Sequence, residues 1–227
     1  MPEKRDYKGD WLKDIILGGQ DGLVNVLALV LGVSAAVSEA RIVLIAGLAG
    51  TFAESISMGA VAYTSTKAAK EYYLSKLKQE RLEIQQLPDL EKEEIHDIYF
   101  RKGFRGKLLQ EIVHKITSRK KLWLDTMMTE ELQLLPSQYE NPLRAGWIVG
   151  LASFGGSIIP LLPFFLFSVS TGRIVALFFS LVILFALGAM KSRFTNQSWI
   201  KGGIEIAGIG IVAALMGHFV GVLLGAY

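Results

Sequence analysis

The sequence contains no cysteine, and this absence excludes several kinds of chemistry at once. Without cysteine the chain can form no disulfide, no thiolate metal site and no cysteine nucleophile. Any metal site in this protein must therefore use carboxylate, histidine, methionine or backbone oxygen ligands.

A strong excess of charge of one sign is also missing. The formal net charge is +3, and this balance is too weak and too mixed in sign to indicate a nucleic-acid-binding protein. The charges are unevenly spread, because long stretches carry almost none while the middle of the chain is crowded with them. With 51% hydrophobic residues, this segregation indicates a membrane protein rather than a soluble one.

Five long apolar stretches predict membrane-spanning helices. A bilayer core about 30 Å thick needs about 20 mostly apolar helical residues to cross it. Backbone groups in lipid must find their hydrogen bonds within the segment, which favours helices. The sequence therefore predicts an all-α polytopic membrane protein with five transmembrane helices. These occupy about residues 15–37, 42–64, 145–167, 174–190 and 202–225.

A long polar segment separates the second and third stretches, and we expect it to form a helical insert. No helix breaker follows the second stretch, so its helix is predicted to continue beyond the membrane. Pro88 suits the first turn of the next helix, Gly103 and Gly106 mark a break, and a last helix runs through Trp123. The predicted domains are an N-terminal segment with two spans (1–66), the insert (67–143) and three further spans (144–227).

Lysine and arginine in short loops predict the orientation of the chain. Basic residues precede the first span and separate the fourth from the fifth, whereas the other short loops carry only Arg41 and Arg173. We therefore expect the N-terminus and the insert to lie in the cytoplasm and the C-terminus to face away from it.

Two acidic residues fall well inside the predicted spans, where ionisable groups are costly and mark functional candidates, while Glu205 of the fifth span lies near the membrane edge and is a weaker candidate. Asp21 lies in the first span, with Asn25 one helical turn further on the same face. Glu54 lies in the second span, with Met58 four residues on. Acids and a thioether without an obvious Lys or Arg partner are more typical of a cation path than of a buried ion pair. Structural hydrogen bonds at a helix interface are the alternative interpretation.

The insert contains a second group of candidate ligands. Two Glu-x-x-Glu pairs lie on consecutive helices, and this spacing puts each pair on one helix face. A Met-Met-x-x-Glu motif follows on the last helix. Carboxylates suit divalent cations, thioethers favour softer transition metals, and facing carboxylate pairs hold iron or manganese in helical bundles. A solvated acidic face explains the spacing equally well. The candidate metal ligands are Glu80, Glu83, Glu91, Glu94, Met127, Met128 and Glu131.

The same segment leaves other classes of function open. Di-iron enzymes such as ferroxidases usually add Glu-x-x-His motifs to their carboxylate pairs. The insert contains two such motifs, at Glu93–His96 and at Glu111–His114. A membrane-anchored enzyme would not explain the acids inside the spans, so we predict a transporter and not an enzyme. A receptor or scaffold without transport is a third alternative, and it would show no metal dependence.

Several segments together resemble the vacuolar iron transporter family. Asp-Gly-Leu-Val-Asn at 21–25 and Glu-Ser-Ile-Ser-Met-Gly-Ala at 54–60 resemble its first two spans. Trp-Leu-Asp-x-Met-Met-x-x-Glu-Leu at 123–132 resembles the end of its insert, and Gly-Gly-x-x-x-Pro-Leu-x-Pro at 155–163 its third span. The chain departs from the family pattern at Thr126, where an aromatic residue is frequent, and at Glu130, an additional acid.

The resemblance implies a homodimer of five-helix protomers that exchanges ferrous iron for protons. It implies that the insert gathers the ion through the seven candidate ligands above, and that Asp21, Glu54 and Met58 line the path through the membrane. The implied substrate is Fe²⁺, with Mn²⁺ as the alternative, and no prosthetic group is expected. The membrane would be that of a vacuole or the plasma membrane of a prokaryote.

Overall fold

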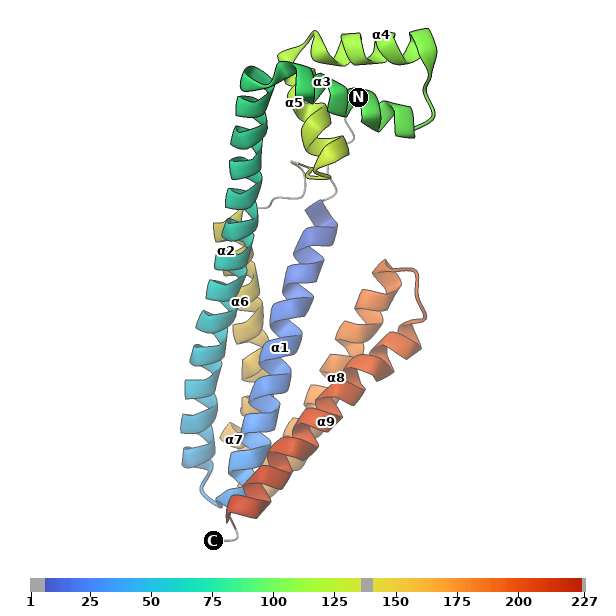
Figure 1. Cartoon of the computed structure of the whole chain (residues 1–227). Helices are drawn as coiled ribbons and strands as arrows, with labels where there is room; N and C mark the ends of the chain where they lie inside the picture. Colours follow the sequence, from blue (N-terminus) through green and yellow to red (C-terminus); the bar gives the residue numbers. More distant parts are fainter. Residues whose placement is uncertain (1–6, 136–140, 226–227) are drawn as a thin grey trace. The chain divides into compact units, whose positions relative to one another are not determined.

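The computed structural model describes residues 7–135 and 141–225, and the regular elements in these ranges are all helices (Figure 1). Five of these helical segments are long and apolar enough to cross a membrane. The prediction of an all-α chain with five transmembrane helices is therefore confirmed. The segments are α1 (Tyr7–Ala36), α2 (Ala40–Gln86), α6 (Pro142–Ile158) continued by α7 (Leu162–Leu166), α8 (Val169–Phe194) and α9 (Trp199–Gly225).

The chain folds as two compact units. One consists of Met1–Thr64 with Pro142–Tyr227, and the other of Ser65–Asn141. We call them the membrane unit and the insert. Helix α2 contributes to both, because it continues without a break for 47 residues, as the lack of a helix breaker predicts. At 1.5 Å per residue this helix is about 70 Å long, more than twice the thickness of a bilayer core.

Helix α1 is the central helix of the membrane unit and packs against α6, α8 and α9. Leu23 of α1 packs with Leu184 of α8 and Ile206 of α9. Further along α1, Val26 and Val30 join a second apolar cluster. Residues on several faces of α1 are thus buried by neighbouring helices, and this packing fixes the position of Asp21 within the unit.

The third predicted span is not one regular helix. A short 3₁₀ turn, Ile159–Leu161, separates α6 from α7. Pro160 and Pro163 explain the interruption, because proline lacks the backbone N–H group and its ring clashes with the preceding turn of an α-helix. The apolar pattern at 145–167 predicts a single span and gives no indication of this break.

Gly22 lets α1 approach α6 closely, directly beside Asp21. A Cβ atom at Gly22 would lie 2.6 Å from Ser157 Oγ and 2.8 Å from Ser153 Oγ, and would overlap the Ser153 carbonyl oxygen. We expect Gly22→Ala to lower the melting temperature of the purified protein by several degrees, since overpacking typically costs about 1–3 kcal/mol. Gly155→Ala is the control, because its added Cβ would have no described atom within 4 Å apart from its chain neighbours and the backbone of its own helix. Equal melting temperatures for the two variants would contradict this packing.

The insert has an apolar core of its own. After the end of α2, it contains α3 (Pro88–Arg101), α4 (Gly106–Thr117), α5 (Lys120–Thr126) and a π-helical turn, Met127–Glu131. Its core includes Ile84, Ile95, Ile116, Trp123 and Met127.

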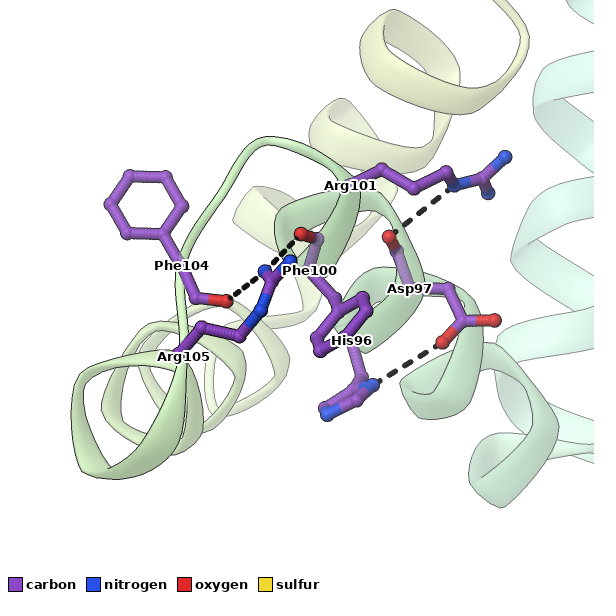
Figure 2. A network of polar contacts seen from close by, with 6 residues as sticks. All are labelled: His96, Asp97, Phe100, Arg101, Phe104 and Arg105. Carbon is purple, nitrogen blue, oxygen red and sulfur yellow. Dashed lines mark hydrogen bonds and ion pairs between the residues drawn. The ribbon is translucent and has the colours of Figure 1, made fainter.

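The predicted helix start at Pro88 and the predicted break at Gly103 and Gly106 are both observed. Pro88 lies in the first turn of α3. Gly103 and Gly106 separate α3 from α4 with φ angles of 98° and 58°, a region that favours glycine. In the same connection, Arg105 donates hydrogen bonds to the carbonyl oxygens of Phe100 and Phe104 and stacks on the Phe100 ring, 3.6 Å from its centre (Figure 2).

Candidate metal sites

Five glutamates of the insert lie within electrostatic reach of one another. Burial, together with the negative charges of neighbouring glutamates, raises the pKa of Glu91 to about 7; these neighbours are Glu94, Glu80, Glu83 and Glu131. The side chains come from three elements: the end of α2, α3 and the π-helical turn. The two Glu-x-x-Glu pairs and the last glutamate of the Met-Met-x-x-Glu motif therefore form one acidic cluster.

Desolvation and mutual repulsion act on the other members of this cluster as well. Burial and repulsion from Glu131, Glu83 and Glu94 together raise the pKa of Glu80 to about 7, although Lys76 acts in the opposite direction. Burial also raises the pKa of Glu94 and that of Glu131, with further contributions from their acidic neighbours. The cluster thus contains more negative charge than its surroundings stabilise.

Two of the five carboxylates have a buried oxygen without a hydrogen bond. The side chains of Glu80 and Glu91 are only 4% and 3% exposed. Within the described residues, Oε2 of each has no hydrogen-bond partner. An ionised carboxylate in such a place is strongly unfavourable unless it is protonated or lies beside a cation. The donor set therefore fits a divalent metal ion, for which several carboxylate oxygens are suitable ligands.

The cluster is not yet a closed coordination shell. In the parts of the chain that the structure describes, no three acidic or histidine side chains already converge on one point. Glu131 is also largely exposed at the end of its turn. A bound ion would therefore draw the carboxylates together by side-chain rotation.

Both methionines of the Met-Met-x-x-Glu motif are buried, Met127 completely and Met128 to within 1%. Met127 packs in the core of the insert with Ile84 and Ile95, and each of these isoleucines follows a cluster glutamate in the sequence. Its thioether therefore lies in the apolar layer beside the cluster, where it also has a packing role.

The π-helical turn is a feature that sequence reasoning missed. The Leu132 amide donates to the Met127 carbonyl at 3.2 Å, five residues back instead of four. In an α-helix the spacing of the motif would put Met127 and Glu131 one turn apart on the same face, and this relation does not hold in the π-helical turn. Such turns are rare, and many of those known lie at functional sites. No residue type in the motif predicts one.

The additional acid Glu130 does not belong to the cluster, because it forms an ion pair with Lys102 at the end of α3. Thr126, the other departure from the family pattern, is buried and donates a hydrogen bond to the Leu122 carbonyl at 2.7 Å. Both departures thus have local structural partners.

The two Glu-x-x-His motifs are not assembled into a di-iron site. His96 and His114 are both exposed. His96 lies 3.3 Å from the Asp97 carboxylate (Figure 2), and Glu111 lies 3.9 Å from the Lys107 ammonium. These side chains occupy solvent-facing positions, unlike the buried Glu80 and Glu91.

The raised pKa values predict how the stability of the metal-free protein depends on pH. Glu80 and Glu91 have a pKa of about 7 in the folded chain against an ordinary value of 4.5, so the folded state binds protons more tightly than the unfolded state. Their contribution is most favourable below pH 4.5 and is lost as the pH rises through 7. We expect the melting temperature of the metal-free chain, measured by circular dichroism, to fall over this interval. Glu80→Gln/Glu91→Gln should flatten the profile, and an unchanged profile would contradict the assignment.

A second polar cluster lies in the membrane unit. Asn25 Nδ2 of α1 donates to Glu54 Oε1 of α2 at 3.0 Å. The Asp21 side chain lies close enough to Glu54 and Asn25 to interact with both of them. Met58 is half-buried one turn beyond Glu54 on α2. The structure thus brings together the two acids that the sequence singled out, and Asn25 donates a hydrogen bond to one of them.

The comparison with known proteins covers almost the whole chain. A model of the VIT family matches residues 12–222. Vacuolar iron transporter 1 of Arabidopsis thaliana is 33% identical over 213 residues, which cover 93% of this chain and 85% of the relative. The vacuolar iron transporter of Plasmodium falciparum is 33% identical over 233 residues, covering 98% and 85%. Vacuolar iron transporter 2 of Oryza sativa is 33% identical over 213 residues, covering 93% and 87%. These names are those of transporters and not of enzymes.

Proposed function

Because this chain belongs to the VIT family, we propose that it moves ferrous iron out of the cytosol across its membrane in exchange for protons. The observation that carries the proposal is the acidic cluster of the insert, in which two buried carboxylate oxygens have no hydrogen-bond partner among the described residues. A second support is the pair of acids Asp21 and Glu54, which interact within the membrane unit. A protein with no metal cargo would have little use for either arrangement.

In the proposed mechanism the insert lies in the cytoplasm and captures the ion. Glu80, Glu83, Glu91, Glu94 and Glu131 supply carboxylate oxygens, and Met127 and Met128 supply thioether sulfur beside them. Near neutral pH, Glu80 and Glu91 are partly protonated because their pKa values lie at about 7. Binding of a divalent cation therefore releases protons from the cluster, and acidification opposes binding.

The ion then passes through the membrane unit along Asp21, Glu54 and Met58. A carboxylate that holds a cation in one state and a proton in another couples the two fluxes. Asn25 positions the Glu54 carboxylate by its hydrogen bond, which favours a defined geometry over a freely rotating side chain.

We further propose that two copies of the chain form the working transporter. Asn25 is exposed on the surface of the membrane unit although it belongs to the polar cluster. Polar groups in transmembrane helices generally face the interior of a bundle rather than lipid. A second copy that packs against this face would cover the cluster and enclose the path.

The experiment that tests the function is Fe²⁺ uptake into proteoliposomes that contain a pH-sensitive dye, with and without an imposed proton gradient. Uptake accompanied by proton movement in the opposite direction supports the exchanger. Iron binding without flux would overturn it. Mn²⁺ added as a competitor measures selectivity, since the same ligands also suit manganese.

A further inference from the structure

A polar pocket of about 250 Å³ lies in the membrane unit where the end of α1 meets the start of α8. It is lined by hydroxyl groups and one arginine, and none of these residues belongs to the two acidic clusters. They include Ser34, Ser38, Ser168, Ser170 and Arg173. The proposed transport path therefore does not account for this pocket.

Arg173 carries a buried donor without an acceptor. Its Nε atom is inaccessible to solvent and has no hydrogen-bond partner among the described residues. Leaving a buried charged donor unpaired is costly. The planar guanidinium group matches the oxygens of phosphate and carboxylate, with which it forms paired hydrogen bonds. An oxyanion in the pocket would supply the missing acceptor.

The first turn of α8 adds further donors to the same pocket. The Ser168 hydroxyl precedes this helix, but it contacts Ser170 Oγ at 3.4 Å and donates to Thr171 Oγ1 at 3.3 Å. It therefore caps no backbone N–H group of the helix. Uncapped N–H groups and the positive end of the helix dipole favour an anion. The carbonyl end of α1 borders the pocket as well, and the charge of Arg173 offsets its repulsion.

Arg173 also lines a second cavity, an apolar groove of about 410 Å³ between α8 and α9. Its walls include Leu177, Leu181, Ile211 and Leu215. A free inorganic anion would make no use of this groove. A molecule with a phosphate group and a hydrocarbon chain would fill both cavities, with Arg173 at their junction.

We propose that this end of the membrane unit binds one phospholipid. Arg173, the pocket hydroxyls and the first turn of α8 hold its phosphate group, and one acyl chain lies in the groove between α8 and α9. The complementarity of charge at the pocket and of polarity along the groove points to this occupant. The bound lipid would complete the contacts that hold the start of α8 near α1 and α9.

The test is native mass spectrometry of the full chain purified in detergent, followed by phosphate analysis of extracted lipid. Wild type is expected to retain about one phospholipid per chain. Arg173→Gln should lower retention by about tenfold or more, which corresponds to the loss of one charge-assisted hydrogen-bond pair. Arg41→Gln is the matched control. Arg41 is exposed at the start of α2, and its substitution removes the same charge without touching the pocket. Equal retention by the two variants would overturn the proposal.

A second variant separates a lipid from a free anion. Leu215→Trp fills the apolar groove and leaves Arg173 in place, so lipid retention should fall although the charge is kept. Titration of delipidated wild type with inorganic phosphate provides the other probe. Tight, Arg173-dependent binding of inorganic phosphate together with normal lipid content in Leu215→Trp would overturn the phospholipid. Size-exclusion profiles identify any variant that fails to fold. If either Arg173→Gln or Leu215→Trp fails to fold, lipid retention by the other variant decides the test.

Discussion

Replacing Glu80 and Glu91 together with glutamine is expected to weaken Fe²⁺ binding to the purified protein by more than about 100-fold. The same double variant is expected to raise the melting temperature of the metal-free chain at pH 8. The loss of Fe²⁺ affinity and the gain in thermal stability have one cause. Both carboxylates are almost completely buried, and each has an oxygen without a hydrogen-bond partner in the described structure. In the proposed function they are ligands when metal is bound, whereas without metal they repel each other in a poorly solvated place.

The measurement combines anaerobic titration calorimetry with Fe²⁺ and thermal unfolding without metal. Glu93→Gln is the matched control, because Glu93 lies on the same helix as Glu91 but is exposed. It removes one negative charge without removing a buried ligand, and both readouts should stay close to wild type. A double variant that is less stable than wild type without metal would show that the two carboxylates have a structural partner and are not a vacant ligand pair.

Segments with strong local signals were predictable from the sequence. The five apolar runs specify transmembrane helices because their length and composition match a bilayer. Pro88, Gly103 and Gly106 specify a helix start and a break through backbone chemistry alone. Each of these predictions depends on residues that are close together in the chain.

Features that depend on contacts between distant residues were not predictable. Spacing could place Glu80 and Glu83 on one helix face, but only the packed insert shows that Glu80 is buried while Glu83 is partly exposed. The hydrogen bond from Asn25 to Glu54 joins residues 29 positions apart, and nothing in either segment identifies its partner. The π-helical turn at 127–131 is a shift in backbone hydrogen bonding that the motif spacing concealed.

Asp21→Asn is expected to lower the maximal rate of Fe²⁺ transport in proteoliposomes by at least about 100-fold. Asparagine keeps the size and the polarity of the side chain, but it can neither carry the negative charge nor exchange a proton. Asn25→Ala should give a smaller loss, about tenfold, because it removes one hydrogen bond to Glu54 and leaves both acids in place. Glu205→Gln is the control, since this acid is exposed near the start of α9. Wild-type rates for Asp21→Asn would remove Asp21 from the path.

Asp21→Asn and the double variant Glu80→Gln/Glu91→Gln together distinguish capture of the ion by the insert from its passage through the membrane unit. Asp21→Asn leaves the insert intact, so Fe²⁺ should bind the purified protein with unchanged affinity although flux is lost. Glu80→Gln/Glu91→Gln leaves the membrane path intact, so its transport rate should recover at saturating Fe²⁺ while the KM rises. If both variants instead lost the maximal rate and the affinity together, the acidic cluster and the membrane acids would have to act as one site. The insert would then take part in the transport step itself, rather than supplying the ion to a separate path.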